Sequence, residues 1–177
     1  ARNSAILGRG ILLEGDASLD LVKSHVEVSQ ATGMDPFDQQ SIGINISSAM
    51  GSGTAGRVVL DGTAIRVQST ALHDPSSSGV GIRQSQGEVT LRNGSRIDAD
   101  GIGVIMFSGS SDPALLRIDI DNSTVIGGDG AAIRIATIVN TPGFNIRVAN
   151  GSQLQGADGR LLHVESLIPG RSGAALI

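Results

Sequence analysis

The 177-residue chain contains no cysteine, tryptophan or tyrosine, and its three phenylalanines are its only aromatic residues. Without cysteine the chain has no disulfide, no thiolate nucleophile and no thiolate metal site. Without large rings, a core must be filled by stacked Ile, Val and Leu. This composition favours a regular and repetitive interior.

An excess of positive charge is also absent, because the formal net charge is -4. A nucleic-acid-binding protein needs a basic stripe to displace counterions from phosphates, so we expect no nucleic-acid partner. No run approaches the roughly 20 apolar residues that span a bilayer, and the N-terminus lacks the basic and apolar segments of a signal peptide. We expect residues 1–177 to form one domain, and the apolar end "LIPGRSGAALI" favours a fragment of a longer precursor.

What the chain does contain is a repeat. The phrase "LRNGSRIDADG" returns as "IDNSTVIGGDG" and "VANGSQLQGADG", with the last glycines, Gly101, Gly130 and Gly159, at 29-residue intervals. A fixed period of this length is typical of solenoids. Apolar residues recur at matching places in each unit. The predicted columns are Val58, Val89, Ile118 and Ile146; Leu60, Leu91, Ile120 and Val148; Ile65, Ile97, Ile126 and Leu154; Ile11, Ile44, Ile82, Val104, Ile133 and Leu162; and Leu13, Ile46, Gln84, Met106, Ile135 and Val164.

Within a unit, apolar and polar residues alternate over three to five positions, as in Leu116 to Ile120, which is the period of a half-buried strand. Asn, Asp, Gly and Ser occupy the turns between these runs. A unit of three short strands can bury its apolar face only against its neighbours. The sequence therefore predicts an all-β fold, a single-stranded parallel β-helix of about five to six coils with three short strands each. Stacked turns would place Asn93, Asn122 and Asn150 in an amide ladder.

Two insertions interrupt the repeat at one corner of adjacent coils, in residues 29–41 and 70–78. We expect them to project together from the same side and to carry the ligand contacts. A Phe beside a Met is rare in so aromatic-poor a chain, although Phe37 folded back over a coil edge is an equal alternative. The candidate contact residues are Met34, Asp35, Phe37, Asp38, His73 and Asp74.

The run from Ser78 to Phe107, with "LLRIDIDNSTVIGGDGAAIRI" and "FNIRVANGSQLQGADGRLLHV", resembles the pertactin-like passenger domains of bacterial autotransporters. The resemblance implies a right-handed β-helix on the bacterial cell surface, at the outer membrane or secreted. It also implies a C-terminal outer-membrane barrel in the same precursor, outside this sequence, and loops that act as adhesins in virulence. The adhesive Arg-Gly-Asp tripeptide of pertactin is missing, because Ile11 follows Arg9 and Gly10.

Catalytic and metal-binding patterns are weak. Neither Gly-Asp-Ser-Gly nor Gly-x-Ser-x-Gly occurs, which argues against a serine protease. Asp119, Asp121, Arg134 and Arg147 are the nearest approach to the site of a polysaccharide-degrading β-helix enzyme, but Asp119 and Arg147 are expected to form an ion pair on successive coils.

Asp100, Asp129 and Asp158 are expected to stack at one corner. A ladder of solvated turn residues is the favoured interpretation, and a cation bound between the carboxylates is the alternative. His25, His73 and His163 are not at metal-ligand spacing. We therefore expect no catalytic residue, no metal and no cofactor.

Three hypotheses follow. The first is an adhesin whose rod presents loops to an unidentified host protein or glycan, and which is not an enzyme. The second is a polysaccharide-degrading enzyme, against which the lack of Trp and Tyr sugar platforms counts. The third is a bare structural spacer of a larger autotransporter. A long exposed rod edge also favours self-association.

Overall fold

A computed structural model describes residues 5–8, 10–30, 41–47, 56–69, 79–108, 116–137 and 144–166. The described part consists of short strands and one 3₁₀ turn, η1 (Ala157–Gly159). It contains no helix long and apolar enough to cross a membrane. The strands are β1 (Ala5–Gly8), β2 (Ile11–Glu14), β3 (Ser18–Val22), β4 (His25–Gln30), β5 (Ile42–Ser47), β6 (Arg57–Asp61), β7 (Ala64–Ser69), β8 (Val80–Gln84), β9 (Glu88–Arg92), β10 (Arg96–Ala99), β11 (Ile102–Ser108), β12 (Leu116–Asp121), β13 (Thr124–Gly127), β14 (Ile133–Thr137), β15 (Phe144–Ala149), β16 (Gln153–Gln155) and β17 (Leu162–Ser166).

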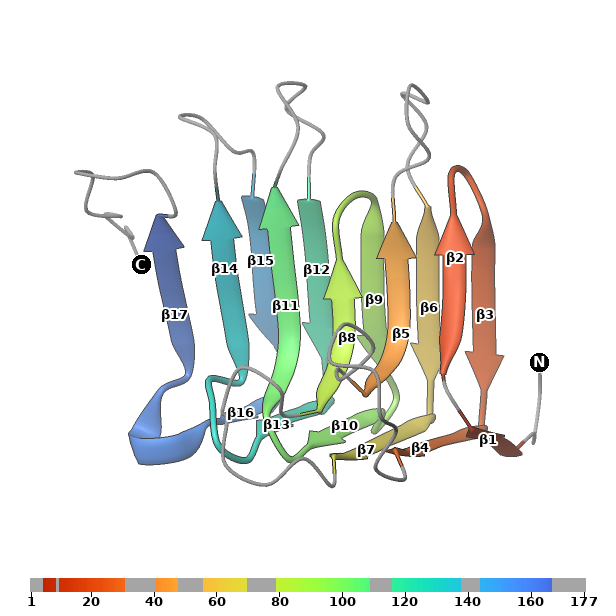
Figure 1. Ribbon diagram of the computed structural model, residues 1–177, viewed down its shortest axis with the longest axis horizontal. Helices are drawn as coiled ribbons and strands as arrows, with labels where there is room; N and C mark the ends of the chain where they lie inside the picture. The colour runs from red at the N-terminus through yellow and green to blue at the C-terminus, as the bar shows by residue number, and fades with distance from the viewer. Residues whose placement is uncertain are drawn as a thin grey trace.

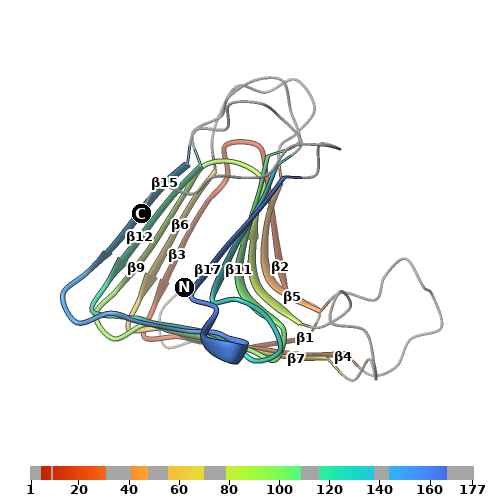
Figure 2. The same ribbon diagram turned by 90° about the vertical axis from the view of Figure 1, so that its left-hand side faces the viewer.

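Each strand pairs in parallel with the strand three positions later in the chain. The strands therefore form three sheets that enclose one core (Figure 1). Sheet A contains β3, β6, β9, β12 and β15; sheet B contains β1, β4, β7, β10, β13 and β16; and sheet C contains β2, β5, β8, β11, β14 and β17. Seen from the C-terminal end, the chain crosses sheet B, climbs sheet C and descends sheet A as it advances toward the viewer (Figure 2). The molecule is thus a right-handed parallel β-helix, as predicted, with five coils of three strands and a sixth of two.

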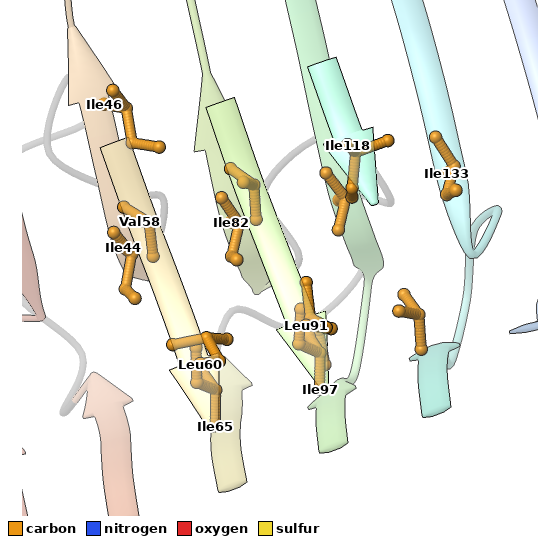
Figure 3. Packing of buried hydrophobic residues seen from close by; sticks show 14 of the residues in the cluster. Ile44, Ile46, Val58, Leu60, Ile65, Ile82, Leu91, Ile97, Ile118 and Ile133 are labelled. Atoms are coloured by element: carbon orange, nitrogen blue, oxygen red, sulfur yellow. The ribbon is translucent and has the colours of Figure 1, made fainter. Parts of the chain in front are cut away.

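The core is built from stacked aliphatic columns (Figure 3). Val58 pairs with Val89, Val89 with Ile118 and Ile118 with Ile146. On sheet C, the predicted column that begins at Ile11 and the one that begins at Leu13 both keep their register to the last coil. Their members from the second to the fifth coil are buried. The predicted columns are therefore confirmed on sheets A and C.

One member of the sheet B column was assigned wrongly. Val125, not Ile126, pairs with Ile97, and Val125 is fully buried. Ile126 pairs with Asp98 in an outward-facing row. The segment "TVIG" offers two adjacent apolar residues, and alternation alone does not decide which of them points inward.

Glycines bring sheet C close to sheet B. Gly43, Gly81 and Gly103 occupy the same place in successive coils, and a Cβ at Gly81 or Gly103 would overlap the side chain of Ile97 or Val125 on sheet B. The glycine that precedes Ile44, Ile82 and Val104 in these three coils is therefore a packing requirement at this corner.

The corner between sheets A and B turns through a left-handed residue in every coil. The residues with positive φ are Asn93, Asn122 and Asn150, at 56°, 44° and 53°. In the first two coils, Lys23 and Gly62 adopt the same left-handed conformation. The prediction that these amides bond to one another is wrong for Asn93 and Asn150. Their side-chain amides donate instead to carboxylates on the preceding coil, those of Asp61 and Asp121. Asn tolerates this backbone conformation, and its amide finds a stronger acceptor in a carboxylate than in another amide.

Directly after the left-handed turn lies a column of hydroxyls that the sequence analysis missed. It consists of Ser24, Thr63, Ser95, Ser123 and Ser152, the first four of them buried. Thr63 Oγ1 accepts from the backbone N–H of Ser24 at 3.2 Å and donates to the carbonyl of Leu21 at 3.0 Å. Ser95 and Ser152 accept in the same way from Thr63 and Ser123. The column satisfies backbone groups that the tight corner would otherwise leave unpaired.

Candidate functional site

The two predicted insertions leave the rod at one corner. Residues 31–40 connect β4 to β5, and residues 70–78 connect β7 to β8. Because β4 pairs with β7 and β5 pairs with β8, both connections start and finish on adjacent coils between sheets B and C, as expected. The candidate contact residues themselves lie outside the described residues, and their role stays a prediction: Met34, Asp35, Phe37, Asp38, His73 and Asp74.

Asp100 holds the base of the second connection. Its carboxylate accepts hydrogen bonds from the backbone N–H of Ser69, where β7 ends, and of Gly79, immediately before β8. The bond from Gly79 measures 2.7 Å. One carboxylate on the following coil therefore joins the two points between which residues 70–78 run. Such charge-assisted bonds to backbone N–H groups are stronger than neutral ones.

The same contacts bear on the predicted stack of Asp100, Asp129 and Asp158. The backbone N–H of Asp129 donates to the carbonyl of Asp100 at 2.7 Å, so these two residues do lie on adjacent coils. Asp158 falls in η1, and its side chain lies outside the described part. The Asp100 carboxylate already has two backbone donors. Within the described ranges, no group of three His, Cys, Asp or Glu residues is placed to hold a metal ion.

Long connections also leave the other ends of the sheet C strands. Residues 48–55, 109–115 and 138–143 link its strands β5, β11 and β14 to sheet A. The outer face of sheet C therefore lies between two sets of long connections, and it is the only one of the three described sheets in this position. The third corner, between sheets A and B, is closed by turns of two or three residues.

One outward row of sheet C combines cationic and apolar side chains. Its members follow the strand register from coil to coil: Leu12, Asn45, Arg83, Ile105, Arg134 and His163. Leu12 and His163 are exposed, and the four residues between them are half-buried. Phe107, in the next outward row, is half-buried and does not belong to the core cluster. The position of this row between the connections follows only from the fold.

The outer face of sheet A is covered by ion pairs. Its four arginines, Arg57, Arg92, Arg117 and Arg147, each lie within 4.0 Å of a carboxylate on the same sheet. Arg147 Nη1 contacts both oxygens of Asp119, at 2.9 and 3.1 Å, which confirms the predicted pair. Its exposed position makes such a pair worth about 0–1 kcal/mol.

The four residues considered for polysaccharide degradation do not share one face of the rod. Asp119, Asp121 and Arg147 belong to sheet A, whereas Arg134 belongs to sheet C. Among described histidines, His25 lies on sheet B beside Glu27, and His163 on sheet C; His73 lies outside the described part. The separation of these side chains follows from the three-sided cross-section.

Asp61 is the acidic group whose environment is most distinctive. Asn93 donates to its Oδ1 at 2.8 Å, and this bond is the largest cause that lowers the pKa of Asp61 below its usual value. Arg92, 3.0 Å from Oδ2, and the positive charge of Lys23 act in the same direction, while partial burial opposes them. The arrangement belongs to the left-handed corner between sheets A and B, where these contacts favour the charged form of the carboxylate.

No protein-family model, curated protein or solved structure matches this chain.

Proposed function

We propose that this protein is a binding scaffold: a rigid β-helical rod that presents side connections, and the face between them, to a host protein or glycan. The observation that carries the proposal is that the long connections between described strands all start or finish at one of the two ends of the sheet C strands. Loops placed on a rigid scaffold are a common location for recognition residues. The proposal includes the surface-exposed or secreted, adhesin-type role of a bacterial passenger that the sequence resemblance implies.

The rod is suited to this task because its stacked core columns and the ion pairs of sheet A are built from residues of the strands and not of the connections. Neighbouring coils stabilise one another in a solenoid, so variable segments can be inserted at a corner without altering the core. The Asp100 carboxylate further fixes the two ends of one insertion.

Two variants test the proposal. In the first, residues 31–39 and 70–78 are replaced by short Gly-Ser turns; in the second, the matched control, residues 109–115 alone are shortened. Both are compared with the parent chain on an array of matrix proteins and glycans, after circular dichroism has shown an intact β fold. We expect the first variant to lose binding that the parent shows and the control to retain most of it. An intact parent rod that binds nothing on the array would instead favour the structural-spacer alternative.

A further inference from the structure

We infer that Asn150 is a site of spontaneous chemical modification, at which the side-chain amide is converted to a carboxylate. The backbone nitrogen of Gly151 gives its proton to hydroxide and attacks Cγ of Asn150, which forms a cyclic imide. The side-chain nitrogen takes up a proton and leaves as ammonia. Water then opens the imide to an aspartate or an isoaspartate at position 150. The reaction consumes only water, and the inference does not rest on the proposed function.

The local sequence carries the first step. A glycine after asparagine favours imide formation, because it places no side chain in the way of the attacking nitrogen. The chain has two such steps, in identical Asn-Gly-Ser segments that begin at Asn93 and Asn150. Both asparagines have a positive φ, 56° and 53°, and both are exposed together with the glycine that follows. Both side-chain amides also donate to a carboxylate on the preceding coil. The two segments are therefore matched except in their contacts with the next coil.

The attacking nitrogen carries the second step. The N–H of Gly94 donates to the carbonyl of Asn122 on the next coil at 2.7 Å, so this bond must break before the nitrogen can attack. The N–H of Gly151 has no acceptor within the described ranges, where β15 is the last strand of sheet A. Asn122 is protected as well, because the residue that follows it, Ser123, donates its N–H to Ser152 Oγ at 3.2 Å.

The Asp-Gly steps of the chain follow the same rule. An aspartate before glycine can form the same imide, with loss of water instead of ammonia. In each of the four Asp-Gly steps, the glycine N–H donates to a backbone carbonyl at 3.0 to 3.3 Å. These glycines are Gly62, Gly101, Gly130 and Gly159. Among the described glycines that follow Asn or Asp, Gly151 therefore stands alone in having a nitrogen without a hydrogen bond to another described residue.

The product would alter the last left-handed corner. The side-chain amide of Asn150 donates to Asp121 Oδ1 at 2.6 Å. After the reaction a second carboxylate takes the place of this donor, and like charges at such a distance repel. An isoaspartate also adds one atom to the backbone of the turn. We therefore expect the corner to loosen, beginning with the bond of 3.2 Å from the N–H of Asn122 to the carbonyl of Ala149.

The experiment follows the intact chain over time at mildly alkaline pH by mass-spectrometric peptide mapping. We expect Asn150 to react at least about fivefold faster than Asn93, because only the Gly94 nitrogen must first break a hydrogen bond. In urea that unfolds the chain, the two identical segments should react at similar rates. Asn150→Gln is the control that keeps an amide at this corner. After equal incubation, the amide of Asn122 should exchange hydrogen faster in the parent than in this variant.

Equal rates at Asn93 and Asn150 in the folded chain, or a faster reaction at Asn93, would overturn the inference. A rate ratio in urea as large as that in the folded chain would also overturn it, because the contacts between coils would then not cause the difference. A folded chain in which neither asparagine reacts, although both react in urea, would show that the last coil is protected like the others and would refute it too.

Discussion

Asp100 accepts a hydrogen bond of 2.7 Å from the backbone N–H of Gly79 on the preceding coil. Since it also accepts from the N–H of Ser69, a single side chain spans the gap between β7 and β8. A corner of the solenoid that receives an inserted segment is thus closed by a carboxylate from the next coil. In a coil without an insertion, backbone pairing alone can close the corner.

Replacing Asp100 by Ala should loosen this corner. Two backbone N–H groups would lose a charged acceptor, which costs about 1–3 kcal/mol of the free energy of unfolding. Hydrogen exchange should accelerate at the amides of Ser69 and Gly79 before it accelerates in the core of β8. Asp98→Ala removes a partly exposed carboxylate from β10, two residues before Asp100, and serves as control. Equal exchange at both amides in the Asp100 variant and the parent would contradict the assigned role.

The hydroxyl column predicts a specific cost for Thr63→Val. The substitution keeps the shape of the side chain but leaves the buried N–H of Ser24 and the carbonyl of Leu21 without their partner. We expect a loss of about 1–3 kcal/mol in the free energy of unfolding, measured by chemical denaturation. Thr90→Val, on the outer face of sheet A, should change it by no more than about 0.5 kcal/mol. Similar values for the two variants would mean that the column is not structural.

Asp61 predicts a pH dependence. Its lowered pKa in the folded state means that its stabilisation is present above the unfolded pKa of about 3.9 and is lost as the pH falls through the lower folded value. The stability difference between the parent and Asp61→Asn should therefore be largest near neutral pH and should shrink in acid. Urea denaturation across the acid range measures it. A difference that grows on acidification would show that the sign of the shift is wrong.

The stacked core predicts a cavity effect at Leu60. Leu60 is fully buried, and pairs with Leu21 on one side and Leu91 on the other. Leu60→Ala should cost about 2–5 kcal/mol. Leu161, 49 % exposed, is the matched control and should cost much less when replaced by Ala. Comparable losses would indicate that the columns do not supply the stability of the rod.

The sequence predicted the coil and most of its columns because one apolar pattern recurs in every unit. It failed at Val125, where two adjacent aliphatic residues fit equally well. Counting from the corner hydroxyl would have resolved the choice, since the inward residue comes two positions after Thr63, Ser95 and Ser123 alike. The hydroxyl column itself had a visible signal, a Ser or Thr at each corner, whose meaning depends on the bonds between coils.

The candidate site was less accessible to sequence reasoning. The insertions could be placed at one corner from their spacing, but the contact residues within 31–40 and 70–78 are not related to one another by the repeat. The position of sheet C between two sets of connections was not visible in the sequence, because it depends on which strands pair in three dimensions.

The most direct test of the account is a hydrogen-exchange footprint of the full chain with and without a matrix protein or glycan that it binds on the array. We predict slower exchange at amides of β8, β11 and β14 of sheet C and no change along β9 and β12 of sheet A. Protection along sheet A with none on sheet C would contradict the claim that the face between the connections is the binding surface.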